Sequence, residues 1–418
     1  MSTTRSFNSM LNEYLPNRLL KEEMIRRDYV LQKVNKDDKW KGGNLVVPFR
    51  GNRANSAKFG SLTASNDISE AQYVRGNITG YQEVWGTLKF NHRDLMEHDG
   101  KIPESTFLRI LPDQIEEHME YFKEIVSGQL LNNPYFASAT DSTNANVGIF
   151  IVDRVEKFYI SQKVTLDDDD TAQTDVYVIA IDQNTSSVTF SATRGGAAAD
   201  LSAYTVAQNA RFYHDGVLVG GVVTNNFVSL RSALLSAANG GSSTLHGVSK
   251  LLWPHLQAIN VDGSTVTATN FLDKVFDGYR DVRRKAKGKA TDILMSYKNL
   301  GSAMKLIEVQ KGGYKVSPNS EKASEFGWTE IEITSVTNEK LKFVGIQEMD
   351  DDVIMYLDWS GMTFRSNGMF KRRKSPDGIE YFEVRNTTGY EYIVDHCLFG
   401  ELEVRNPGHC GIMHSISY

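Results

Sequence analysis

The chain has 418 residues, enough for roughly two or three domains with a substantial apolar core. Apolar residues make up 40% of it and charged residues 23%, proportions that exclude the disordered and fibrous classes. The formal net charge of −6 is small for this length, so the sequence is not adapted to attract nucleic acid by charge alone.

The sequence carries no signal for export or for membrane insertion. Residues 1–12 lack the basic segment followed by an apolar run that marks a secretory signal, and no run approaches the roughly eighteen apolar residues that span a bilayer. Two cysteines, Cys397 and Cys410, are too few for a disulfide framework. We therefore expect a protein that is made and kept in the reducing cytosol, without a membrane partner.

An N-terminal arm is expected over residues 1–43. Its apolar residues are scattered among charges and interrupted by Pro16, which indicates a short amphipathic helix within an extended segment. These apolar residues are Leu15, Leu19, Leu20, Met24 and Ile25. The alternative is a frayed terminus.

Residues 44–99 have the chemistry of strands and turns but too few apolar side chains for a core of their own. Leu45, Val47 and Phe49 alternate as in a half-buried strand, a stretch rich in Gly, Asn and Ser follows, and strand character returns over residues 81–91. The pattern predicts a long two-stranded excursion. Because an isolated hairpin is marginally stable in water, we expect it to lie across another surface.

The clearest helix follows this excursion. Its apolar residues recur at spacings of three and four and are Ile115, Met119, Phe122, Val126 and Leu130. Pro112 is expected in the first turn, and Asn132, Asn133 and Pro134 end the helix. At about 1.5 Å per residue, the helix is expected to be roughly 30 Å long.

The pattern then changes to short strands. Residues 134–146 have no periodicity and suggest a boundary, and regularly spaced strands with polar turns follow between residues 148 and 225. This spacing predicts a small inserted β-barrel or sandwich.

Beyond the glycine-rich break at residues 240–243, helical and strand patterns mix. Helices are expected over residues 271–282 and around residues 300–307, with a buried strand at 293–295. Strands are predicted over residues 328–336, 341–346, 353–357, 379–385 and 390–399. An α+β core is the natural interpretation.

No motif for an enzyme is present. Phosphate-binding, dinucleotide-binding, zinc-protease and hydrolase patterns are all absent, which lowers the odds of catalysis. We therefore expect a chain that is not an enzyme and has no cofactor or catalytic residues.

Two groups of residues have the chemistry of metal ligands but not the spacing. His396-Cys397 and His409-Cys410, with His414 nearby, offer zinc ligands, yet neighbours in a strand point to opposite faces. The acidic runs at residues 167–170 and 350–352 lack the alternating spacing and glycine of a calcium loop. Solvated turns are the favoured interpretation, and no metal site is expected.

Residues 371–374 form a basic run, Lys-Arg-Arg-Lys, that leads into a Ser-Pro-Asp-Gly turn. A solvated hairpin is the simpler reading. Contact with an acidic neighbour or with packaged nucleic acid is the alternative.

The order of arm, excursion, long helix, inserted β domain, α+β core and closing strands resembles the major capsid proteins of tailed double-stranded DNA bacteriophages. Residues 382–400 and the Gly411-Ile412-Met413-His414 tail look like the closing strands of that family. Leu245-His246-Gly247-Val248, with Trp253-Pro254 after it, looks like the segment that links the inserted barrel back to the core.

The resemblance implies an α+β fold of the Hong Kong ninety-seven type. The implied parts are an N-terminal arm (1–43), an extension loop (44–99), a spine helix with part of the peripheral domain (100–147), an inserted small β-barrel domain with its linker (148–245), and the axial domain with the remainder of the peripheral domain (246–418). Strands between residues 328 and 385 would complete the peripheral sheet, while residues 291–310 and the C-terminal strands would build the axial domain.

The resemblance also implies a role. The chain would be a structural virion protein that assembles in the bacterial cytoplasm, as hexamers and pentamers, into an icosahedral shell around DNA that it does not read. Further expected partners are a separate scaffolding protein, a portal and a decoration or cement protein. The residues expected at assembly contacts are Leu45, Val47, Phe49, Val84, Trp85 and Leu88.

Two alternatives accompany this reading. An encapsulin-like compartment of the same fold would store an enzyme instead of a genome, although simple compartments generally lack an inserted β domain. Some family members cross-link neighbouring subunits through a lysine of the extension loop, and Lys58 and Lys89 lie in that segment. No partner asparagine or catalytic carboxylate can be assigned, so cross-linking is not expected.

Overall fold

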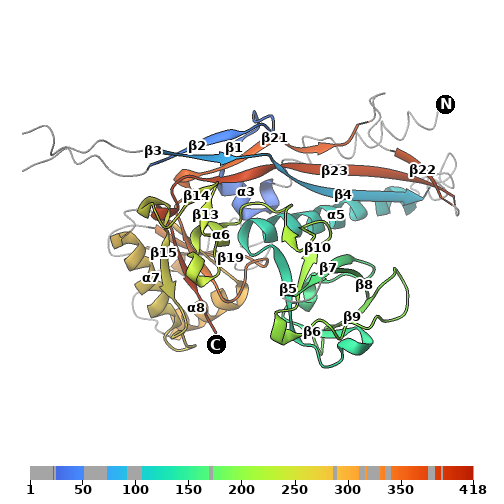
Figure 1. The fold of residues 1–418 in the computed structure, drawn as a ribbon. Coiled ribbons are helices and arrows are strands. Elements are labelled where there is room, and N and C mark those ends of the chain that lie inside the picture. Colours follow the sequence, from blue (N-terminus) through green and yellow to red (C-terminus); the bar gives the residue numbers. More distant parts are fainter. Residues whose placement is uncertain are drawn as a thin grey trace, which may run out of the picture. The chain divides into compact units, whose positions relative to one another are not determined.

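The structure is a computed structural model, and Figure 1 shows its fold. It describes residues 22, 25–50, 73–91, 106–168, 173–285, 290–309, 316–317, 330–334, 340–374, 382–386 and 389–417. The chain divides into two compact units, of which the smaller is Asn132–Ser229 and the larger comprises Met1–Leu131 and Leu230–Tyr418. The larger unit contains a five-stranded sheet, a seven-stranded sheet and the long helix α5 (Thr106–Leu131). The predicted α+β class is therefore confirmed.

A five-stranded sheet is built around the longest strand, β23 (Gly389–Val404). Strand β4 (Gln82–Asn91) pairs antiparallel with residues 391–400 of β23. On the opposite edge, β21 (Met362–Arg372) pairs with residues 396–404 and β22 (Phe382–Asn386) with residues 389–393. Strand β1 (Asn35–Asp37) adds to β21 in parallel.

Helix α5 (Thr106–Leu131) runs along this sheet beside β4 (Figure 1). Met119, Phe122, Val126 and Leu130 are buried, so the predicted apolar stripe is confirmed. The helix begins earlier than predicted. Pro112 therefore lies in the second turn, where its missing N–H removes a backbone hydrogen bond that a first-turn proline would not disturb.

A seven-stranded sheet forms the second layer of the larger unit. Its order is β15 (Ile259–Asp262), β24 (Gly411–His414), β20 (Ile354–Leu357), β16 (Asp292–Met295), β19 (Lys340–Gly345), β18 (Glu330–Thr334) and β17 (Val316–Ser317). Helices α7 (Phe271–Lys285) and α8 (Tyr297–Val309) contribute to one core with these strands. In that core, the buried Tyr356 hydroxyl donates to the carbonyl of Val275 at 3.0 Å.

The closing strands divide between the two sheets. Strands β18, β19 and β20 join the seven-stranded sheet with β24, whereas β21, β22 and β23 form the five-stranded one. The strands between residues 328 and 385 are therefore shared between the two sheets, because pairing depends on contacts distant in sequence.

Helix α3 (Tyr29–Lys33) is short but anchored at its N-terminal end. Asp28 caps it by accepting from the amide of Leu31 at 2.7 Å, and the Tyr29 hydroxyl donates to the buried Asp292 at 3.0 Å. A five-residue helix is unstable alone, so these tertiary contacts hold it. Of the predicted arm helix, Leu15, Leu19, Leu20 and Met24 lie outside the described residues.

The smaller unit is a closed barrel, as the strand spacing predicts. Its strands, in order around the barrel, are β10 (Arg211–His214), β5 (Tyr135–Asp141), β6 (Ile149–Val152), β9 (Ser187–Ser191), β8 (Thr174–Asp182) and β7 (Lys163–Asp167). Four phenylalanines fill its interior, and the rings of Phe190 and Phe212 stack at 5.0 Å.

The predicted limits of the inserted domain, residues 148–245, differ from those of this unit. The barrel starts earlier because β5 occupies residues expected to be irregular. The buried side chains of β5 include Ala137 and Ala139, which are too small to give a clear apolar alternation. The unit also ends earlier, since α6 (Leu230–Leu234) belongs to the larger unit.

Within the described part of the chain, no helix is both long enough and apolar enough to cross a bilayer.

Candidate assembly surface

The base of the predicted excursion is a hairpin of β2 (Leu45–Arg50) and β3 (Tyr73–Ile78). The two strands pair only with each other among the described strands. Residues 81–91 were predicted to be the return strand of this excursion. The prediction is wrong, because this segment forms β4 and pairs with β23. The actual return strand was missed because Gly76 and Asn77 weaken its strand pattern.

The two faces of this hairpin differ. Val47 and Phe49 are fully buried in the chain itself and Leu45 is half-buried, so two of the predicted contact residues already have intramolecular partners. The opposite face exposes Val46 by 53% and Tyr73 by 69%. The predicted stripe of Leu45, Val47 and Phe49 thus faces the chain itself. The apolar surface that the hairpin offers to another molecule lies on the opposite face.

Strand β4 also divides its residues between two faces. Val84 and Leu88 are half-buried and share a face with Gly86, on which His118 and Phe122 of α5 pack. Trp85 points the other way and is 47% exposed, with its ring 5.8 Å from Phe399.

Trp85 belongs to a row of four aromatic rings on the outer face of the five-stranded sheet. Tyr81 packs edge-on against Phe399 at 5.3 Å and against Trp40 at 5.9 Å, and Phe399 packs against Trp85. Edge-to-face pairs at these distances are favourable beyond the area they bury. We call Trp40, Tyr81, Trp85 and Phe399 the aromatic row; Trp40 is buried and Trp85 is exposed to solvent.

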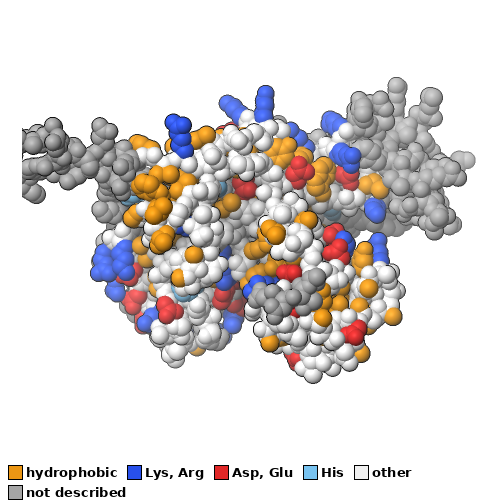
Figure 2. Space-filling model, viewed as in Figure 1, with side chains coloured by type: hydrophobic (Ala, Val, Ile, Leu, Met, Phe, Trp, Pro, Cys, Tyr) orange, Lys and Arg blue, Asp and Glu red, His pale blue; other side chains and the backbone are white. Residues whose placement is uncertain are grey.

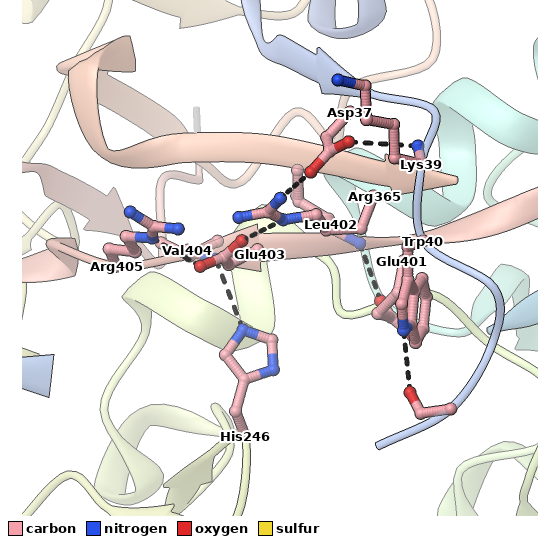
Figure 3. A network of polar contacts seen from close by, with 11 residues as sticks. Asp37, Lys39, Trp40, His246, Arg365, Glu401, Leu402, Glu403, Val404 and Arg405 are labelled. Carbon is pink, nitrogen blue, oxygen red and sulfur yellow. Dashed lines mark hydrogen bonds and ion pairs between the residues drawn. The ribbon is translucent and has the colours of Figure 1, made fainter. Parts of the chain in front are cut away.

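A network of charges ties β1 to the sheet (Figure 3). Glu403 of β23 is buried, and its two oxygens pair with Arg365 and Arg405 at 2.5 Å each. Arg365 also pairs with Asp37 of β1. Because the buried carboxylate has two cationic partners, its charge is compensated, and the N-terminal segment is held at this edge.

Two histidines lie between α5 and β23, of which His396 is buried and His118 is half-buried. The rings of His118 and His396 are 5.6 Å apart, and the ring of His396 stacks on Phe370. Burial lowers the pKa of His118 to about 4. Burial, together with His118 and Arg372 nearby, lowers the pKa of His396 to about 3. Both imidazoles are therefore neutral at physiological pH and act as packing groups.

A third buried cluster joins α3 to α5. Lys123 pairs with the buried Glu348 at 2.9 Å. Burial, with Glu348 nearby, raises the pKa of Asp28 to about 6, although the hydrogen bond from Leu31 opposes the rise. The cluster is part of the packing of the two helices.

The suggested metal ligands do not converge. Among the described residues, no three His, Cys, Asp or Glu side chains are grouped to hold an ion. Burial raises the pKa of both cysteine thiols, to about 12 for Cys410. His409 lies 3.7 Å from Asp358, and His396 is the packing residue described above.

The charged runs have internal partners although several of their residues are exposed. Arg231 of α6 pairs with Asp350 at 2.6 Å and with Asp352 at 2.7 Å, so an arginine occupies the carboxylates considered for calcium. In the basic run, Arg372 is buried and Arg373 lies 3.5 Å from Asp395. The turn after it lies outside the described residues, as does Lys58; Lys89 is exposed on β4.

Figure 2 shows that hydrophobic side chains on one face occur in several separate patches, with Lys and Arg projecting along the edge that carries β1 and β2. His246 was noted in the sequence only as part of a linking segment, and the Glu403 network was not predicted. A signal for the first was available, because His246-Gly247 between Leu245 and Val248 is a two-residue hairpin pattern. Nothing local in the sequence could have shown that Arg365 joins Glu403 to Asp37.

No family model matches the chain, and no curated protein matches it in sequence. Solved structures do resemble it over most of its length. A chain of the cyanophage A-1(L) capsid is 10% identical, with a TM-score of 0.49 and coverage of 93% of this chain and 91% of that one. A capsid chain of the native GTA particle is 10% identical, with a TM-score of 0.45 and coverage of 94% and 90%.

An encapsulin complex from Synechococcus elongatus PCC 7942 is also similar, at 7% identity, a TM-score of 0.42 and coverage of 93% and 87%. At identities of 7–10%, these similarities describe the course of the chain only.

Proposed function

We propose that this chain is a structural shell protein, not an enzyme, that assembles with copies of itself into the capsid of a tailed bacteriophage. The observation that carries the proposal is the β2–β3 hairpin. It pairs with no other described strand and keeps Val46 and Tyr73 exposed. A hairpin of this kind gains stability by lying on a neighbour, and a second copy offers one in every subunit of a shell.

The remaining features agree with this role. Trp85 of the aromatic row provides exposed apolar surface on the five-stranded sheet, and α5 supports that sheet from the other side. Many such contacts, each weak, become strong together when symmetry closes the shell. Leu45, Val84, Trp85 and Leu88 retain exposed surface and are proposed as contact residues, whereas Val47 and Phe49 support the hairpin from within.

In finer detail, residues 1–43 would act as the N-terminal arm, the hairpin as the extension loop and α5 as the spine helix. The five-stranded sheet would belong to the peripheral domain, the seven-stranded sheet to the axial domain, and the barrel would be the inserted domain. Hexamers and pentamers would enclose double-stranded DNA. A separate scaffolding protein, a portal and a decoration protein are the expected partners.

The proposal is tested by expressing the chain with its genetic neighbours and examining the fastest-sedimenting fraction by negative-stain electron microscopy. We expect hollow polyhedral shells that contain this chain. The matched variant lacks residues 51–72 and keeps β2 and β3 joined by a short turn. It should remain folded, with an unchanged circular dichroism spectrum, yet form no shells.

A compact monomer that forms no particles under any of these conditions would overturn the proposal. Normal shells from the deletion variant would overturn a role in assembly for residues 51–72, and normal shells from subunits with Val46→Asp and Tyr73→Asp would overturn the role of the hairpin itself. Shells that contain a folded enzyme and no DNA would indicate an encapsulin-like compartment instead.

A further inference from the structure

His246 lies at the tip of a tight turn between β13 (Thr244–Leu245) and β14 (Val248–Ser249). Its φ is +48° and that of Gly247 is +79°, so both turn residues are left-handed, as a two-residue hairpin requires. A non-glycine residue rarely adopts this conformation and does so where its surroundings hold it there. His246 is only 8% exposed although it occupies a turn.

The base of the β2–β3 hairpin helps to hold His246 in this conformation. The carbonyl oxygen of His246 accepts from the amide of Asn77 at 2.9 Å, and its ring stacks on Phe49 with centroids 6.1 Å apart. Gly76 makes this approach possible. A Cβ there would lie 2.4 Å from the Phe49 ring and 3.0 Å from the carbonyl oxygen of His246.

The same side chain reaches the five-stranded sheet. Nε2 of His246 accepts from the amide of Val404, the last residue of β23, at 3.3 Å (Figure 3). The ring is therefore neutral, with its proton on Nδ1. Glu403, the charged group beside it, is itself fixed by Arg365 and Arg405. The residues of the hairpin that face the ring, Phe49 and Gly76, do not titrate.

We propose that His246 is a positioning residue for assembly: by joining the hairpin base to the end of β23, it fixes the direction in which the β2–β3 hairpin leaves the subunit. The hairpin has no ladder to either sheet among the described strands, so its direction depends on side-chain and turn contacts of this kind. The hairpin can meet a neighbouring subunit in a fixed position only if its base is held rigidly. The inference rests on the proposed function for its biological meaning, but it concerns a property of the single subunit.

The direction of the hairpin is measurable as a distance between two spin labels on unassembled subunits. Tyr73→Cys places one label on β3, and Arg280→Cys places the other on the exposed surface of α7. Both native cysteines are buried, so the added thiols react selectively. With His246 in place, double electron–electron resonance should give one narrow distance distribution.

Three variants separate the contacts. His246→Asn tolerates the left-handed turn but has no ring, and should broaden the distribution. His246→Phe keeps a ring to stack on Phe49 but cannot accept from Val404, and should give an intermediate width. Phe49→Leu removes the stack from the hairpin side and should also broaden it. If the two His246 variants do not fold, Phe49→Leu still tests the inference.

The matched control is Phe343→Leu, which removes a buried ring from the seven-stranded sheet. It should lower stability but leave the distance distribution unchanged, so that a general loss of stability is distinguished from a loss of hairpin direction. A distribution as narrow in His246→Asn and Phe49→Leu as in the parent would overturn the proposal.

Assembly provides the second readout. Folded His246→Asn subunits should give fewer or irregular shells where the parent gives regular ones. If the parent forms no shells, the proposed function fails, while the spin-label distances still decide whether His246 positions the hairpin. If the parent forms shells and the variant forms equally regular ones, only the positioning role fails.

Discussion

Single residues of the sheet and helix interface set a limit on acid stability. The pKa values of His118 and His396 are lowered to about 4 and about 3 in the folded chain. In the unfolded chain both should titrate near about 6.5. Their contribution to stability is therefore complete above that pH and is lost as the pH falls, because the unfolded chain then binds protons that the folded chain excludes.

We predict that the free energy of unfolding decreases between pH 6.5 and 4 by up to about 1.4 kcal/mol per pH unit for each histidine. His118→Phe should reduce this slope and leave stability at pH 7.5 nearly unchanged, as urea unfolding at several pH values would show. Asp28 acts in the opposite direction, since its pKa is raised, and the difference between variant and parent removes its contribution. An unchanged slope would mean that His118 protonates freely in the folded chain.

At the scale of elements, the packing of α5 on β4 depends on a close approach at Gly86. A Cβ at this position would lie 2.8 Å from the His118 ring and 2.9 Å from the Phe122 ring, and both rings belong to the buried interface. Gly86→Ala should therefore destabilise the larger unit by about 1–3 kcal/mol, measured by denaturant unfolding.

Gly128→Ala is the matched control, because a Cβ there meets open space on α5. It should stabilise the chain by up to about 1 kcal/mol through helix propensity. If both substitutions were neutral, the helix would not approach the strand as closely as described.

The predictable elements are those with strong local periodicity. The stripe from Met119 to Leu130 identifies α5, and the alternation around Phe49 identifies β2, because each pattern is set by neighbours in sequence. Strand β5 was missed because its buried alanines carry little apolar signal. The pairing of β4 with β23 could not be predicted, since it joins residues about three hundred positions apart.

The candidate assembly surface was predictable only in part, because its packing also depends on contacts between residues distant in sequence. The strand around Phe49 was predicted and is β2, but which of its faces turns inward depends on contacts with Gly76 and His246 that arise only in the folded chain. Sequence alternation defines two faces and does not say which one is covered.

At the scale of the whole molecule, the chain should unfold in two steps. The barrel, Asn132–Ser229, has its own core of stacked phenylalanines and should fold when expressed alone. Phe212→Ala should destabilise it by about 3–5 kcal/mol. In the full chain, calorimetry should then show only one of two transitions moving.

Tyr356→Phe supplies the converse control in the larger unit, where it removes the hydrogen bond to Val275 and should cost about 1 kcal/mol. It should move the other transition. A single cooperative transition that shifts with either substitution would contradict the independence of the two units.

Because of strand β23, the five-stranded sheet should resist force differently along its strands and across them. Backbone hydrogen bonds of an antiparallel pair run perpendicular to the strands, and β23 is bonded along both edges, to β4 on one side and to β21 and β22 on the other. A pull along β23 loads these bonds together in shear, whereas a pull across the sheet opens them one after another. The subunit should therefore resist tension far better along this strand than across it, and a pressurised wall made of such subunits would be strongest in the directions that its long strands follow.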